Sequence, residues 1–212
     1  MTTMSLMERL KTETMPAHKV AESQPLERAL ISGQLPLPHY IEYVAQRLLV
    51  HRALEAQMRV LREADPRVAP LLGDERFHEP RALADLRFLG RDPAAVTALP
   101  ATKALINAIK ETAAANPIAL LGFLYVFEGS TNGARYIAMA LRRSYQFSDR
   151  QGTNYLDPYG DQQPVLWAQF RTIVNELSLS HEEQDAIVGA AQATFEHMIA
   201  VDTEIYSTGT NL

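Results

Sequence analysis

The sequence predicts an all-α protein, and three observations support this fold class. Apolar residues recur at intervals of three and four over most of the 212 residues. Two Ser-x-x-Glu capping boxes, Ser5 with Glu8 and Ser180 with Glu183, precede such periodic segments and mark helix starts. No stretch of convincing length alternates apolar and polar residues with the period of two that a half-buried strand shows. We expect a single domain over residues 1–212.

The helices are expected in the following order along the chain. The first begins after the capping box at Ser5, and Pro16 should end or kink it, because proline removes a backbone hydrogen bond and clashes with the preceding turn. A restarted segment should then run from Ala17 to Ile31, before the Ser32-Gly33 stop signal. Further helices are predicted at 39–63, 80–89, 101–114, 118–143, 165–177 and 181–206. Residues 146–164 are polar and rich in turn formers, which predicts a loop, and 207–212 are expected to form a flexible tail.

Composition excludes several kinds of site. The chain has 20 Lys and Arg against 25 Asp and Glu, a net charge of −5, which argues against general nucleic-acid binding. It has no cysteine, which excludes disulfides, thiolate nucleophiles and cysteine-bound zinc, iron–sulfur clusters or haem. A metal or cofactor must therefore be held by other side chains or by backbone, and the six histidines become the first candidates.

No segment approaches the roughly 18 to 20 uninterrupted apolar residues of a membrane helix. The N-terminus carries acidic residues and lacks the apolar core of a secretory signal. We expect a cytoplasmic protein that has neither a membrane nor a nucleic acid as its partner.

The segment 118–143 contains more glycine than a helix usually carries. Gly129 and Gly133 lie one turn apart, with the poor helix formers Ser130, Thr131 and Asn132 between them. Two glycines cost a helix about 2 kcal/mol relative to alanine. Removing the Cβ atoms lets a flat ligand lie against the backbone or lets the helix bend over a site. The alternative is close packing against another helix, and the residues alone do not decide between the two.

His18 is the favoured candidate for a metal ligand. Glu22 follows it by one helical turn, a spacing at which the two side chains meet. A carboxylate on one ring nitrogen fixes the tautomer and leaves the other nitrogen free for a metal. The same spacing recurs in His51 with Glu55 and in His181 with Asp185. Most such pairs are solvent-exposed helix faces, and we expect this of those two pairs. His18 differs because it follows a proline and because Val20 and Ala21 adjoin the pair.

A di-iron carboxylate bundle is the competing all-α metal site. It needs two Glu-x-x-His pairs and two further glutamates on facing helices. Glu75 with His78 is the one pair that has this spacing, and it lies in a turn-rich region. No phosphate-binding loop, nucleophile elbow or zinc-binding His-Glu-x-x-His helix is present.

Two segments of the chain together resemble one family. Residues 11–22, KTETMPAHKVAE, resemble the proximal helix of haem oxygenases. Residues 125–134, YVFEGSTNGA, resemble their distal helix, in the bacterial Glu-Gly-Ser-x-x-Gly-Ala form. The likeness extends over about residues 6–206. It implies a single-domain, all-α helical bundle that holds haem between a proximal and a distal helix.

The resemblance implies a role for each matching residue around the iron. His18 would be the axial ligand of the haem iron, and Glu22 would orient its imidazole. Gly129 and Gly133 would carry the distal helix across the haem face, where the missing side chains admit bound dioxygen and let the helix flex.

The resemblance also implies contacts around the edge of the haem. Lys11 and Arg171 would each bind a haem propionate through a charge-assisted hydrogen bond. Tyr125 would make a polar contact near the haem edge, and Phe195 would form part of the wall.

Two positions of the distal segment depart from the family pattern. Ser130 stands where some members carry an aspartate that organises waters for proton delivery, and Asn132 stands where leucine is common. Bacterial members often hold such waters with backbone carbonyls, so neither change excludes activity. Asn132 either bonds a distal water or faces outward, and the part of both residues in a distal water network stays open.

The activity that the resemblance implies is oxidative cleavage of haem to biliverdin, carbon monoxide and ferrous iron. Haem would be both substrate and cofactor, and O2 would be the co-substrate. No flavin or nicotinamide motif is visible, so the electrons are expected from a separate ferredoxin, flavodoxin or reductase. One alternative is a non-catalytic haem-binding carrier or buffer on the same scaffold. A second is an all-α enzyme of the same bundle type that acts on a thiamin-like molecule, although the chain has no cysteine nucleophile for it.

Overall fold

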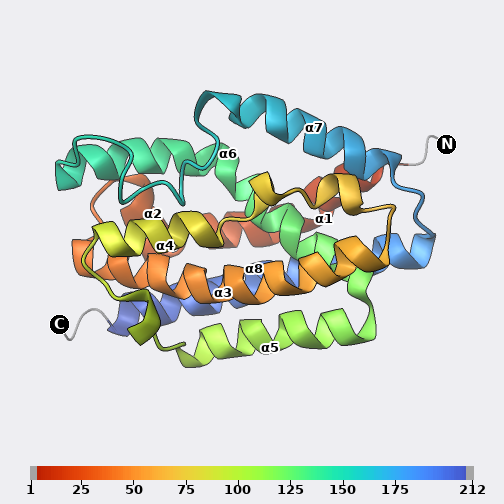
Figure 1. The fold of residues 1–212 in the computed structure, drawn as a ribbon, viewed down its shortest axis with the longest axis horizontal. Coiled ribbons are helices and arrows are strands. Elements are labelled where there is room, and N and C mark those ends of the chain that lie inside the picture. The colour runs from red at the N-terminus through yellow and green to blue at the C-terminus, as the bar shows by residue number, and fades with distance from the viewer. Residues whose placement is uncertain (1–3, 209–212) are drawn as a thin grey trace.

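The computed structural model describes residues 4–208, in which helices form almost every element and no strand occurs (Figure 1). The α-helices are α1 (Leu6–Glu22), α2 (Pro25–Ile31), α3 (Leu37–Ala64), α4 (Glu79–Phe88), α5 (Pro100–Ala115), α6 (Leu120–Tyr145), α7 (Gln163–Glu176) and α8 (His181–Thr208). Short 3₁₀ turns lie between them at Ala69–Leu71 (η1), Asp74–Arg76 (η2), Pro93–Ala95 (η3), Pro117–Ala119 (η4) and Gly160–Gln162 (η5). The all-α prediction is confirmed.

Helix α8 is the centre of the packing. It lies against α1, α2, α3, α5 and α6, and it runs behind α3 in Figure 1. Its buried apolar residues recur at helical intervals and include Ile187, Ala191, Val201 and Ile205. Because α1 and α6 both pack on α8, this helix sets where those two helices lie relative to one another.

Gly122 brings α6 unusually close to α8. A Cβ atom at this position would lie 2.6 Å from the backbone nitrogen of Ala191, closer than real Cβ atoms approach other atoms. Close helix packing therefore accounts for this glycine.

The helix starts follow the predicted signals, but the break in the first segment is elsewhere. Ser5 and Glu8 form the reciprocal capping box at the start of α1, as Ser180 and Glu183 do ahead of α8. Pro16 was expected to end or kink the helix, and the first alternative was wrong, since α1 continues to Glu22. Pro16 lies on the exposed side, where the Thr12 carbonyl that loses its amide partner can bond water.

The actual break precedes Pro25, which occupies the first turn of α2, a position where its missing N–H costs nothing. Gly33, at φ 69°, ends that helix as the stop signal predicted.

The remaining connections agree broadly with their expected ranges. Residues 146–162 contain turns and η5, and α7 begins at Gln163. Helix α8 continues through residues 207 and 208, and the rest of the expected tail lies outside the described residues. Among residues 4–208, no helix is both long and apolar enough to cross a membrane.

Candidate functional site

Two contacts join the segment α1–α2 to α6 and define a gap between them. At one end Tyr125 of α6 lies beside Thr14 of α1, whose side chain lowers the pKa of the tyrosine, although burial raises that pKa overall. At the other end the backbone of Gly33 lies against α6, where an added Cβ atom would be 3.2 Å from the Cβ of Ala140. Both segments run in the same direction from the first contact to the second. We use the name gap for the space between these two contacts; helical residues of α1, α2 and α6 flank it, and all three helices pack on α8.

His18 lies on the α1 side of this gap, one turn beyond Thr14. Its side chain is 47% exposed, and its Nδ1 is 3.6 Å from the Glu22 carboxylate. Its ring meets the edge of the buried Phe195 ring of α8, with 5.7 Å between the centroids. Among residues 4–208, no hydrogen-bond partner is found for Nε2. One nitrogen thus faces a carboxylate while the other is available, as a metal-bound imidazole requires.

Gly129 and Gly133 lie on the α6 side, one and two turns beyond Tyr125. A Cβ atom at Gly129 would meet Trp167 at an ordinary 3.7 Å, and one at Gly133 would have no atom within 4 Å. Close helix packing, which explains Gly122, therefore does not explain these two glycines. Their open surroundings favour the other explanation, a backbone left bare for a ligand.

The three residues between these glycines bond back to their own helix. Ser130 Oγ donates to the Phe127 carbonyl at 2.7 Å, and Thr131 Oγ1 donates to the Glu128 carbonyl at 2.7 Å. Asn132 Nδ2 donates to the Gly129 carbonyl at 2.8 Å. Such local bonds compete with the helix ladder and favour bending. The hydroxyl donor of Ser130 and one of the two amide donors of Asn132 are therefore used within α6, while Ser130 Oγ and Asn132 Oδ1 can still accept hydrogen bonds.

Two predicted cations, Lys11 and Arg171, are exposed and form no ion pair within the part of the chain that the structure describes. Lys11 lies on α1, two turns before His18. A shallow groove of about 510 Å³ runs along α1 and is lined by Lys11, Thr12, Met15, Pro16 and Lys19. Lys19, which the sequence analysis did not single out, adds a second lysine to its border. Arg171 lies on α7, close enough to Tyr125 for its charge to act on that tyrosine.

Aromatic rings extend the wall from α6 onto α7. Trp167 stacks on Phe170, with 5.3 Å between the centroids and 10° between the planes. It also lies 6.2 Å from Tyr125. The gap is thus bordered by the available imidazole of His18, by backbone without side chains at Gly129 and Gly133, by exposed cations and by aromatic rings. These groups fit a flat, apolar molecule that carries an iron and carboxylate groups.

The family of the chain follows from its similarity to known proteins. A family model described as "Heme oxygenase" matches residues 4–204. The chain belongs to the haem oxygenase family. It is 26% identical over 208 residues to a heme oxygenase of Takifugu rubripes, covering 92% of this chain and 72% of that one.

Solved structures share the fold of this haem oxygenase. The structure of heme oxygenase-2 from Synechocystis, in complex with heme and NO, has a TM-score of 0.90 at 19% identity and covers 97% of this chain and 86% of its own. The heme oxygenase of Leptospira interrogans has a TM-score of 0.87 at 20% identity and covers 95% of this chain and 100% of its own.

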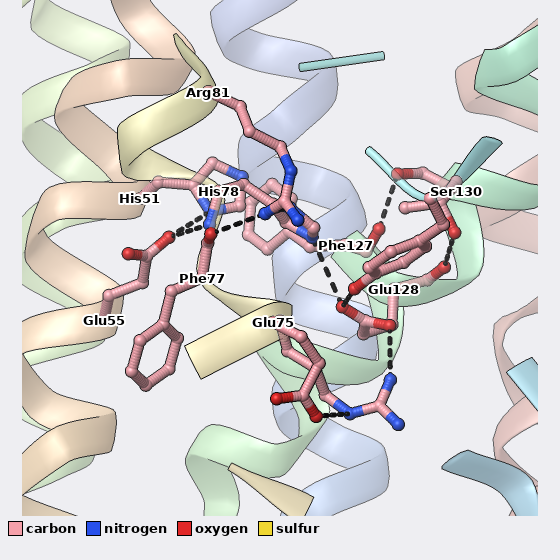
Figure 2. Close-up of polar contacts among 12 residues, drawn as sticks. His51, Glu55, Glu75, Phe77, His78, Arg81, Phe127, Glu128 and Ser130 are labelled. Carbon is pink, nitrogen blue, oxygen red and sulfur yellow. Dashed lines mark hydrogen bonds and ion pairs between the residues drawn. The ribbon is translucent and has the colours of Figure 1, made fainter. Parts of the chain in front are cut away.

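A polar cluster, buried except for the partly buried Tyr159, joins α6 to neighbouring elements (Figure 2). We call it the buried polar cluster, and its members are His51, Glu55, Arg76, His78, Glu128, Tyr155 and Tyr159. The expectation that His51 and Glu55 form a solvent-exposed face was wrong, since they are 2% and 1% exposed. The start of α4 covers them, because Glu55 accepts hydrogen bonds from the backbone N–H groups of His78 at 2.6 Å and Glu79 at 2.9 Å. Glu55 thus serves as an anion at the positive end of a helix.

His51 links this carboxylate to the loop between α6 and α7. Its Nδ1 is 3.2 Å from Glu55, and its Nε2 is 3.1 Å from the hydroxyl of the buried Tyr155. Burial lowers the pKa of His51, and the hydrogen bond to Glu55 opposes that shift. His51 is therefore neutral at pH 7.

The sequence contained one signal for this cluster that we did not use. Glu128 is a charged residue directly after the apolar run 118–127, and a carboxylate in such a context is buried only when it is paired. Its partners lie about 30 to 50 residues away in the chain, so the pairing itself could not be read from local spacing.

Proposed function

We propose that this haem oxygenase binds haem in the gap between α1 and α6 and cleaves it to biliverdin, carbon monoxide and ferrous iron. O2 would be the co-substrate, and a separate ferredoxin, flavodoxin or reductase would supply the electrons. One observation carries the proposal: the available Nε2 of His18 and the bare backbone of Gly129 and Gly133 flank the same gap.

The haem would supply the iron and the porphyrin carbon that reacts. The protein binds and orients it. Glu22 lies 3.6 Å from Nδ1 of His18, where it would orient the imidazole and leave the Nε2 lone pair free for the iron. Phe195 fixes the imidazole plane from the other side through its edge contact. Gly129 and Gly133 would leave room for the haem and a small ligand beside the α6 backbone.

The edge of the haem would be held by charge and by aromatic contact. Lys11 on α1 and Arg171 on α7 are free to form charge-assisted bonds with the two propionates. Tyr125 of α6 lies beside Thr14 of α1 at one end of the gap. Ser130 would act as an acceptor of hydrogen bonds from distal water, because its hydroxyl donor is occupied, and Asn132 would accept through Oδ1.

Titration with ferric haem tests the assigned ligand. His18→Ala should weaken haem binding at least tenfold and change the absorption spectrum of the complex, because the imidazole ligand is lost. The exposed His18 contributes little to packing, so the free energy of unfolding should change by less than about 0.5 kcal/mol. The matched control is His181→Ala, an exposed histidine with an acidic residue one turn later, which should leave both affinity and spectrum unchanged. A His18→Ala protein with the wild-type spectrum and affinity would refute the ligand assignment.

A further inference from the structure

Glu128 is fully engaged by side chains from outside its own helix (Figure 2). The Tyr159 hydroxyl donates to Oε1 at 2.6 Å, and Arg76 Nη1 donates to Oε2 at 2.8 Å. His78 Nε2 lies 3.3 Å from Oε1. Arg81 Nη1, a donor, lies 3.4 Å from the other ring nitrogen of His78, which makes that nitrogen the acceptor and places the hydrogen on Nε2.

These donors fasten Glu128 to separate parts of the fold. Arg76 lies in η2, His78 lies at the start of α4, and Tyr159 lies in the loop that precedes α7. Burial would raise the pKa of Glu128, but the hydrogen bonds and charges of His78, Arg76 and Tyr159 outweigh it, and the pKa is lowered. The side chain is therefore a carboxylate at pH 7, and its loss would leave the buried Arg76 with a single, 4.0 Å contact to the exposed carboxylate of Glu75.

The residues that follow Glu128 in α6 have low helix propensity. Two glycines and three back-bonded side chains lie within residues 129–133. On the buried side of this stretch, Thr131 Oγ1 accepts a second anchor, a 2.9 Å hydrogen bond from Gln163 Nε2 at the start of α7. A helix segment of low propensity keeps one conformation only when its surroundings fix it.

We propose that Glu128 is a positioning residue: its bonds to Arg76, His78 and Tyr159 fix where the Gly129–Gly133 backbone lies along the haem gap. The carboxylate faces away from that gap and does not contact the ligand. It acts through the helix, because a shift of Glu128 moves the bare backbone of the next turn. This inference rests on the proposed function only for its haem-dependent readout.

Amide hydrogen exchange of the haem-free protein tests the positioning directly. Glu128→Gln keeps the size of the side chain but turns one acceptor oxygen into a donor that faces Arg76 or the Tyr159–His78 pair. Exchange of the amides of residues 130–137 should become at least tenfold faster relative to residues 120–126 of the same helix. The matched control is Asp202→Asn, which alters another buried carboxylate bonded to an arginine, Arg47, at 2.6 Å. In Asp202→Asn, any change in amide exchange should follow from the change in global stability and should be the same for residues 130–137 as for residues 120–126.

A second readout uses carbon monoxide as a probe on the ferrous haem complex. The C–O stretching band reports the surroundings of the distal ligand, so it should shift or split in Glu128→Gln and stay unchanged in Asp202→Asn. Uniform exchange along α6 in Glu128→Gln, or equal effects of the two variants, would overturn the proposal. If the protein bound no haem, the proposed function would fail, while the exchange result would still decide the role of Glu128.

A milder variant keeps the test decisive if Glu128→Gln does not fold. Tyr159→Phe removes a single donor to the carboxylate and leaves its ion pair with Arg76. It should speed exchange in residues 130–137 by a smaller factor and leave residues 120–126 unaffected. Unchanged exchange in residues 130–137 would refute the positioning role.

Discussion

Substituting Gly133 by alanine should separate the stability of the protein from its affinity for haem. Gly133 lies within α6, and a Cβ atom there would meet no atom within 4 Å. The substitution therefore adds no clash to the haem-free protein, and it removes the entropic cost of glycine in a helix. We expect a gain of about 0.5–1 kcal/mol in the free energy of unfolding. In the proposed complex, the new methyl group enters the space above the haem, and the haem affinity should fall at least tenfold, or by about 1.4 kcal/mol or more.

The assay is a pair of measurements on each variant, urea unfolding of the haem-free protein and titration with ferric haem. Gly189→Ala is the matched control, because Gly189 is an exposed glycine of α8 whose added Cβ would also meet nothing within 4 Å. It should gain similar stability and keep the wild-type affinity. Equal haem affinity of Gly133→Ala and Gly189→Ala would refute the reasoning, and so would a loss of stability in Gly133→Ala.

Two further predictions concern charge. The double variant Lys11→Ala with Arg171→Ala should bind haem more weakly than wild type. This loss of affinity should shrink at high ionic strength, because salt screens charge contacts. Spectroscopic titration with haem at low and high salt measures the loss, and Lys103→Ala, which removes an exposed lysine of α5, is the control. Glu27 has its pKa raised to about 7 by burial and by the charge of Asp202, with Arg47 opposing. Since the folded state then binds more protons than the unfolded state between about pH 4.5 and 7, stability falls as pH rises through that window. Unfolding experiments should find Glu27→Gln about 1–3 kcal/mol more stable than wild type at pH 8 and little different at pH 5, and an equal difference at both pH values would contradict this.

The helices could be predicted because their signals are local. Capping boxes, prolines and apolar periodicity lie within a few residues of the boundary that they set, and Ser5 and Ser180 both cap as expected. The exception, Pro16, shows the limit of local reasoning. Whether a proline ends a helix depends on whether solvent can satisfy the carbonyl that it frees, and that is a property of the packed molecule.

The candidate site was predictable in part for the same reason. The His18–Glu22 spacing and the order of the two glycines follow from one helix each, so the sequence could indicate them. The sequence left two explanations open for Gly129 and Gly133, and close helix packing is not the reason for them, because Gly133 faces open space, whereas Gly122 does pack against α8. The buried polar cluster was not predictable, because it joins η2, α3, α4, α6 and the loop before α7. Its members become neighbours only through tertiary packing.

Turnover of bound haem tests the central claim most directly. The haem complex is prepared without oxygen, supplied with ascorbate as the electron donor, and then exposed to air. The account predicts loss of the Soret band, growth of red-region bilin absorption and release of carbon monoxide, with biliverdin identified by chromatography. A Soret band that persists under ascorbate and oxygen would contradict the account and would indicate a haem carrier on the same scaffold.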